Sequence, residues 1–113
     1  MWKKLINMND EYSIDRGSVF RFPADYPFES YVDFMSINLL DWSNTIALVV
    51  ASGYKKGLVT QRLPVDAICQ RYRDCLNAGW MKVNWNEWVY EDCRVSDVYV
   101  SEDRVVPISL PAF

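Results

Sequence analysis

Short stretches of alternating or continuous hydrophobic residues dominate this chain, a pattern typical of β-strands. The strongest is residues 46–51, Ile-Ala-Leu-Val-Val-Ala, which is rich in β-branched residues and too short to span a membrane. It predicts a strand over 45–52 that is covered on both faces. Gly53 and Gly57 then tolerate the positive φ of a tight loop, and residues 57–63 predict a more polar return strand. The hydrophobic pattern therefore places a buried hairpin at the centre of the fold.

The preceding residues predict further strands. Apolar and polar residues alternate over 35–40, which indicates a strand that joins the hairpin through a turn at 41–44 and forms an antiparallel meander. Residues 19–22 predict another strand, which Pro23 ends because proline lacks a backbone N–H. Residues 28–34 fit two periods, a helical stripe or an extension of the following strand, and both alternatives stay open.

Helical spacing is clearest over 64–77. Pro64 suits the first turn of a helix, and 77–79, Asn-Ala-Gly, predicts its end. The apolar face of this predicted helix comprises Val65, Ile68, Cys69, Tyr72 and Leu76. Residues 80–90 fit both a strand and a helix, and the helix is favoured because the apolar stripe persists through Val89 while the alternation breaks at Glu87.

The two ends of the chain are less regular. The segment up to Asn7 predicts either an edge strand or a short helix, and residues 95–100 predict a closing strand. Residues 105–113 are apolar but twice interrupted by proline, so we expect an extended arm lying on the domain. With 113 residues and no repeat or linker, the expected fold is a single α+β domain over 1–113, an antiparallel meander with one or two packed helices.

Composition and charge narrow the classes of function. Half of the residues are hydrophobic, which supplies ample material for a core, and we expect the five tryptophans mainly to fill it. The net charge of −3 and the pI of about 4.8 argue against nucleic-acid binding through phosphate neutralisation. A basic partner is the natural complement of this charge, but acidity also serves solubility alone, and the charge by itself favours that simpler explanation. Lys3 and Lys4 precede no apolar segment of the kind that secretory signals contain, so a cytoplasmic location without membrane association is expected.

Several kinds of chemistry lack their usual residues. The chain has no histidine, which removes Ser-His-Asp and Cys-His nucleophile arrangements and the HExxH zinc motif. Cys69, Cys75 and Cys93 include no CxxC pair, so free thiols are expected rather than a disulfide framework or a metal site. No glycine-rich phosphate loop is present either. The sequence therefore predicts no cofactor and no metal.

Carboxylates offer one remaining catalytic arrangement. Glu29 and Asp33 are four positions apart, and on a helix they would share a face and could act as a general acid and base. A solvated acidic face explains the same spacing, because acid–base work requires one carboxyl group to be desolvated and nothing in the sequence indicates that. We therefore expect no enzyme activity, and a small carboxylate-dependent hydrolase remains an alternative.

Four segments form a further pattern: 16–23 (RGSVFRFP), 27–35 (PFESYVDFM), 52–58 (SGYKKGL) and 84–90 (NWNEWVY). In order and approximate spacing over about residues 16–100, they resemble a family of bacterial polymorphic-toxin immunity proteins, immunity protein 45. The resemblance implies a cytosolic antidote that binds a cognate toxin domain and blocks it, without cofactor or turnover. It assigns no interface residues.

The resemblance thus implies a toxin protein as the partner. The acidity of the chain suits a basic toxin, such as a nuclease whose substrate groove an acidic antidote occupies. Acidic residues gather towards the carboxyl end, and exposed aromatic residues are the other candidate anchors. The candidate partner-binding residues are Glu91, Asp92, Asp97, Glu102, Asp103, Tyr26, Trp42 and Tyr54. Either a monomer or a homodimer is compatible with this prediction, and a structural or adaptor module of a phage or secretion assembly is a further alternative.

Overall fold

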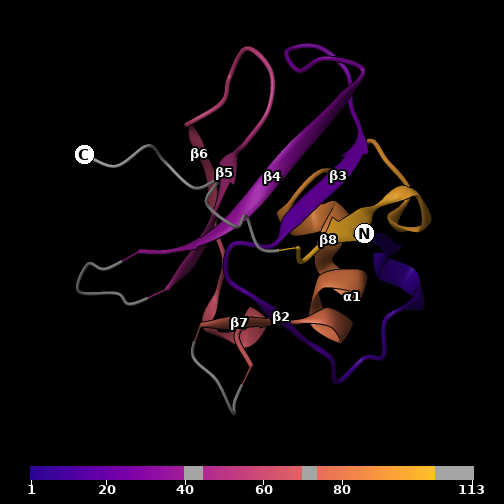
Figure 1. Ribbon diagram of the computed structural model, residues 1–113, viewed down its shortest axis with the longest axis vertical. Helices are drawn as coiled ribbons and strands as arrows, with labels where there is room; N and C mark the ends of the chain where they lie inside the picture. The colour runs from indigo at the N-terminus through magenta and orange to yellow at the C-terminus, as the bar shows by residue number, and fades with distance from the viewer. Residues whose placement is uncertain (40–44, 70–73, 104–113) are drawn as a thin grey trace, which may run out of the picture.

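A six-stranded antiparallel sheet forms the centre of the computed structural model, which describes residues 1–39, 45–69 and 74–103 (Figure 1). In spatial order its strands are β1 (Trp2–Lys4), β8 (Tyr99–Ser101), β3 (Val19–Pro23), β4 (Tyr31–Asn38), β5 (Ile46–Val50) and β6 (Val59–Arg62). A small second sheet pairs β2 (Ser13–Asp15) with β7 (Cys75–Asn77). The α-helix α1 (Ala78–Trp88) and the 3₁₀ turns η1 (Leu5–Asn7), η2 (Val65–Ala67) and η3 (Val95–Asp97) complete the described α+β fold.

The predicted meander is confirmed. β4 pairs with β5 and β5 with β6, all antiparallel, and a register shift between Leu48 and Val49 marks an irregularity in the second pairing. Gly53 and Gly57 adopt φ values of 71° and 95° in the hairpin loop, as the turn requires. β4 begins at Tyr31, so residues 31–34 extend the strand as one alternative predicted, whereas residues 28–30 belong to the loop before it. The helical stripe was misleading. Residues 41–44, the predicted turn, lie outside the described residues.

One face of the sheet packs against α1. The alternation along the strands places large apolar residues on this face, and Trp85 of the helix is fully buried among them. Its ring lies 5.7 Å from the ring of Phe20 and 5.1 Å, edge to face, from that of Phe22. The sheet residues of this core are Phe20, Phe22, Val32, Phe34, Ile46, Leu48, Val50 and Val100. The helix favoured over residues 80–90 is thus confirmed. It begins and ends two residues earlier than predicted.

The helix predicted over 64–77 is wrong. Among its described residues, 65–67 form the short turn η2, with Val65 exposed, and 75–77 form β7. Ile68 bridges Leu76, and the Cys69 N–H donates to the Cys75 carbonyl at 3.0 Å. Leu76 is held by pairing with β2 rather than by helical contacts. Tyr72 lies outside the described residues.

The expected stop signal at 77–79 is instead a start. The Asn77 side chain accepts a hydrogen bond from the Trp80 N–H at 2.7 Å and caps the N-terminus of α1. Gly79 allows the close approach of Asp10, because a Cβ atom at this position would lie 2.7 Å from the Asp10 carbonyl oxygen. Asparagine and glycine are common at both ends of helices. Here they stand where a strand of the second sheet ends, so they mark the beginning of a helix and not its end.

The ends of the chain combine the predicted alternatives. The first seven residues contain both the edge strand β1 and the turn η1. The closing strand predicted over 95–100 is wrong in its first half, where η3 forms, and β8 begins only at Tyr99. All three cysteines are free and buried, as expected. Residues 105–113, the predicted arm, lie outside the described residues.

Candidate functional site

An acidic cleft opens where β3 begins and β8 ends. Its volume is about 640 Å³, and its lining comprises Asp15, Arg16, Gly17, Ser18, Asp74, Glu102 and Asp103. Four of these residues carry carboxylates and one carries a guanidinium, so the cleft presents a negative potential to its surroundings. We refer to this surface as the acidic cleft.

The second sheet builds one wall of the acidic cleft. The pairing of β2 with β7 sets Asp15 opposite Cys75, and Asp74 immediately precedes β7. Arg16 fixes the two segments together: its N–H donates to the Asp74 carbonyl at 3.1 Å, and its guanidinium lies 4.0 Å from the Asp74 carboxylate. Gly17, at φ 85°, then turns the chain into β3 while its N–H donates to the Ser36 carbonyl at 2.7 Å.

The end of β8 builds the opposite wall. The Tyr12 hydroxyl donates to the Glu102 carboxylate at 2.5 Å, and the amino group of Met1 forms an ion pair with Asp103. The hydrogen bond to Glu102 holds the phenolic proton, and with burial and the Glu102 charge it raises the pKa of Tyr12 to about 12. Asp103 remains largely exposed, so its carboxylate is open to a partner.

A buried thiol lies between the carboxylates of the first wall. Cys75 Sγ is 3.3 Å from the Asp15 carboxylate and 3.5 Å from that of Asp74. Burial, together with these hydrogen bonds and charges, raises the pKa of Cys75 to about 12. The thiol therefore stays protonated near neutral pH, which makes it a poor nucleophile in this state.

The acidic cleft contains two of the five acidic residues that the sequence predicted to bind a partner. It also contains two acidic residues that the sequence did not predict. Glu102 and Asp103 were predicted as partner-binding residues, whereas Asp15 and Asp74 were not. The missed pair comes from distant parts of the chain, and only the β2–β7 pairing brings them together. The Arg-Gly-Ser turn at 16–18 before a predicted strand was the one sequence signal for this corner.

The other three acidic residues lie elsewhere. Glu91 and Asp92 are exposed in the turn after α1, and Asp97 belongs to η3 at the opposite end of β8 from Glu102. Asp97 forms an ion pair with Arg94 at 3.3 Å and lines a separate pocket of about 270 Å³ with Tyr31 and Tyr99. The carboxyl-terminal acidic residues therefore do not form one cluster.

Two of the three predicted aromatic residues lie on loops at the same end of the sheet (Figure 1). Tyr26, in the loop 24–30, is 96% exposed and Tyr54, in the loop 51–58, is 92% exposed. Glu29 joins the loops, because its carboxylate accepts a hydrogen bond from the Tyr54 N–H at 2.8 Å. The remaining candidate, Trp42, lies outside the described residues.

Comparison with protein families identifies the chain. The family model described as Immunity protein 45 matches residues 5–100. The chain belongs to the immunity protein 45 family. The match confirms the resemblance seen in the sequence and also spans the segment 65–77, which lies between the segments that carry the resemblance. No curated protein matches the chain. No solved structure matches it.

The suggested acid–base pair is not assembled in this immunity protein 45 family member. Asp33 accepts two hydrogen bonds from the Arg21 guanidinium, at 2.7 and 2.9 Å, while Glu29 binds the loop at Tyr54. The hydrogen bond from the Tyr54 N–H holds the pKa of Glu29 below its usual value, which is opposite to what a general acid needs. Each carboxylate thus has a structural partner of its own.

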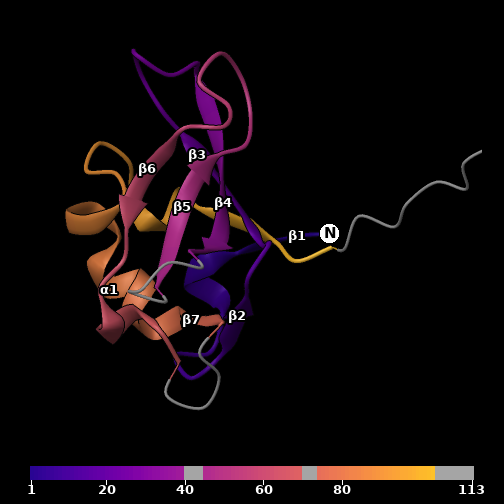
Figure 2. The same ribbon diagram turned by 90° about the vertical axis from the view of Figure 1, so that its left-hand side faces the viewer.

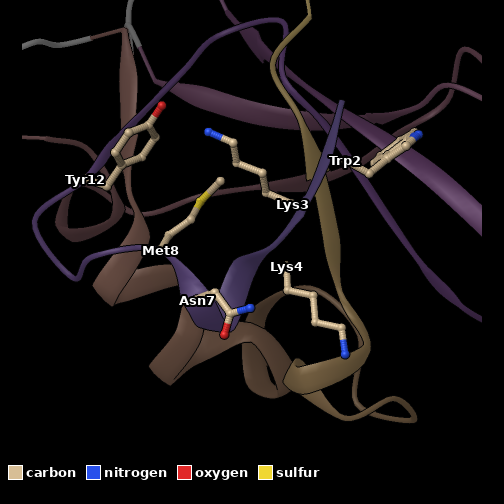
Figure 3. A pocket seen from close by; sticks show the side chains of 6 residues that line it. All are labelled: Trp2, Lys3, Lys4, Asn7, Met8 and Tyr12. Atoms are coloured by element: carbon tan, nitrogen blue, oxygen red, sulfur yellow. The ribbon is translucent and has the colours of Figure 1, made fainter.

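A second pocket of about 430 Å³ adjoins β1 in this immunity protein (Figure 3). Figure 3 shows Lys3, Met8 and Tyr12 on one side of β1 and Trp2 on the other. Tyr12 links this pocket to the acidic cleft through Glu102. Within the described ranges, no group of three or more histidine, cysteine, aspartate or glutamate residues could hold a metal ion. No helix in these ranges is long and apolar enough to cross a membrane.

Proposed function

We propose that this protein is a cytoplasmic antidote that neutralises a cognate bacterial toxin by stoichiometric binding. Membership of the immunity protein 45 family supports a toxin as the partner. The acidic cleft is the observation that carries the proposal, since it presents four carboxylates beside one guanidinium on an accessible surface. Such a surface favours fast association with a basic protein.

The toxin proposed for this site has a basic surface, as a nuclease has around its substrate groove. Lysine and arginine side chains of the toxin would enter the acidic cleft and pair with Asp15, Asp74, Glu102 and Asp103. The antidote would then occupy the position of the phosphate backbone and exclude the substrate. Inhibition of this kind needs neither turnover nor a cofactor, and its extent follows the ratio of antidote to toxin.

Co-expression tests the proposal. The toxin domain encoded beside this chain should arrest growth alone and should fail to do so when the chain is co-expressed. The purified proteins should form a complex of fixed stoichiometry, and inhibition should be complete only when the antidote equals or exceeds the toxin. Protection by catalytic amounts of the chain, with the toxin cleaved or modified, would instead establish an enzyme.

A further inference from the structure

An apolar stripe crosses the face of the main sheet that lies opposite α1. The strand registers align Trp2, Ser101, Val19, Met35, Val49 and Val59, one residue from each of the six strands, and we call this row the outer stripe. Trp2 and Val59 are exposed, at 39% and 53%, and the valines and methionine between them are partly exposed. In Figure 2, α1 lies beside the other face of the sheet.

The outer stripe is more apolar than an ordinary solvated sheet face. An antiparallel sheet with one solvated face normally alternates apolar residues inward with polar residues outward. Here β3, β4 and β5 place Val19, Met35 and Val49 outward although Phe20, Phe34 and Leu48 already face the core. The turns η1, η2 and η3 all contact α1, and Trp2 and Val59 at the two ends of the outer stripe remain exposed.

An aromatic cluster around Arg21 adjoins the outer stripe and shares Trp2 with it. The Arg21 guanidinium is 4.5 Å from the ring centre of Trp2 and 5.0 Å from that of Tyr31, while both of its bonds to Asp33 fix its orientation. The ion pair balances the charge of Arg21, which leaves the aromatic surfaces as the exposed feature. Tryptophan, tyrosine and arginine dominate the energetic centres of protein interfaces, and side chains that are ordered in advance lose little entropy on binding.

The outer stripe is continuous with the acidic cleft. In the chain, Glu102 of the acidic cleft directly follows Ser101 of the outer stripe, and Ser18 of the cleft directly precedes Val19 of the stripe. The ion pair between the Met1 amino group and Asp103 joins the two surfaces again beside Trp2. A negative border therefore runs along one end of an apolar surface.

We infer that the outer stripe and the acidic cleft form one docking surface for the toxin. The inference rests on the proposed function and specifies the partner: a protein face with an apolar patch bordered on one side by lysine or arginine residues. The cleft increases the rate of encounter, and burial of the stripe slows dissociation. The cleft alone would supply fast association without a desolvated interface, and the stripe alone would supply a desolvated interface without electrostatic attraction.

A matched pair of valines tests the inference. Val59→Asn alters the outer stripe, whereas Val83→Asn alters an exposed valine of α1 on the other side of the sheet. Binding of a catalytically disabled toxin domain from the adjacent reading frame is measured by surface kinetics. Val59→Asn should raise the dissociation rate, and Trp2→Ser/Val59→Asn should raise it at least tenfold, while both leave the association rate within about twofold. Val83→Asn should change neither rate.

Other outcomes overturn the inference in distinguishable ways. If the unaltered chain does not bind this toxin domain, the proposed function itself fails. If it binds but the stripe variants and Val83→Asn dissociate at the same rate, the toxin docks elsewhere and only the inference fails. If sedimentation shows a dimer that Trp2→Ser/Val59→Asn dissociates while toxin binding is unchanged, a second copy covers the stripe. Circular dichroism of each variant, and Met35→Gln as a second stripe variant, keep folding separate from binding.

Discussion

The carboxylate of Glu29 accepts a hydrogen bond from the backbone N–H of Tyr54, and this contact joins the loops on either side of β4 and β5. The contact depends on the neighbouring glycine. Gly53 has φ 71°, and a Cβ atom built on it would lie 2.2 Å from Glu29 Oε2. Only glycine at this position allows the carboxylate to approach the loop so closely.

Alanine substitutions should separate this contact from backbone strain. Gly53→Ala should lower the free energy of unfolding by more than Gly57→Ala, because both residues have positive φ but only Gly53 faces Glu29. The strain common to both is roughly 1–2 kcal/mol. Denaturant titration of the two variants measures the difference. Equal losses would show that Glu29 moves away at no cost and that the contact contributes nothing.

Acid should release the Glu29 contact. The hydrogen bond from the Tyr54 N–H lowers the pKa of the folded Glu29 carboxyl below its ordinary value. The stabilisation that this hydrogen bond gives to the contact between the loops is thus fully present above the ordinary pKa of glutamate. It is lost as the pH falls through the lowered pKa of Glu29 in the folded protein. In an NMR titration the Tyr54 amide shift should therefore have a midpoint below 4.5. A midpoint at or above that value would contradict the contact in solution.

The Cys75 thiol should resist alkylation in the folded protein. Its pKa is raised to about 12 by burial and by Asp15 and Asp74, so little thiolate forms at about pH 9, where an ordinary cysteine is substantially ionised. Peptide mapping after iodoacetamide treatment should show Cys75 labelled much more slowly in the native protein than in denaturant. Equal labelling rates would place Cys75 in solvent and remove it from the wall of the acidic cleft.

Trp85 should contribute more to stability than any other tryptophan of the described residues. It is fully buried against Phe20 and Phe22, and its indole N–H points at Cys93 Sγ, 3.3 Å away. Trp85→Ala should cost about 3–5 kcal/mol, as large aromatic truncations in cores do. Trp88→Ala, at a partly buried position of the same helix, is the matched control and should cost less. Similar losses would mean that α1 does not pack on the sheet through Trp85.

The sequence predicts the central sheet well because its signals are local. The apolar run at 46–51, the alternation over 35–40 and the glycines at 53 and 57 act within a few residues and were sufficient for the meander. The segment 64–77 misled the prediction because its helical spacing competes with a distant partner. Pairing of β7 with β2 overrides that spacing, and the Asn77 cap then belongs to the next element.

The candidate site was predictable only in part for the same reason. Glu102 and Asp103 were found because they are adjacent in the chain, whereas Asp15 and Asp74 join them only through strand pairing. The apolar run at 46–51 indicated a strand covered on both faces, and α1 covers one of them. On the other face Val49 stays partly exposed, so the predicted cover of this face is not seen for Val49 among the described residues.

Kinetics of toxin binding across a salt series test the central claim most directly. Glu102→Lys/Asp103→Lys reverses two charges of the acidic cleft, and Glu91→Lys/Asp92→Lys makes the same net change in the turn after α1. Melting temperatures should hardly change, because the contacts of these side chains are exposed. The cleft variant should associate with the toxin domain at least tenfold more slowly at low salt and lose most of its salt dependence, while the control stays near the unaltered protein. Identical association rates for both variants and the unaltered chain at every salt concentration would contradict the acidic cleft as the site of toxin binding.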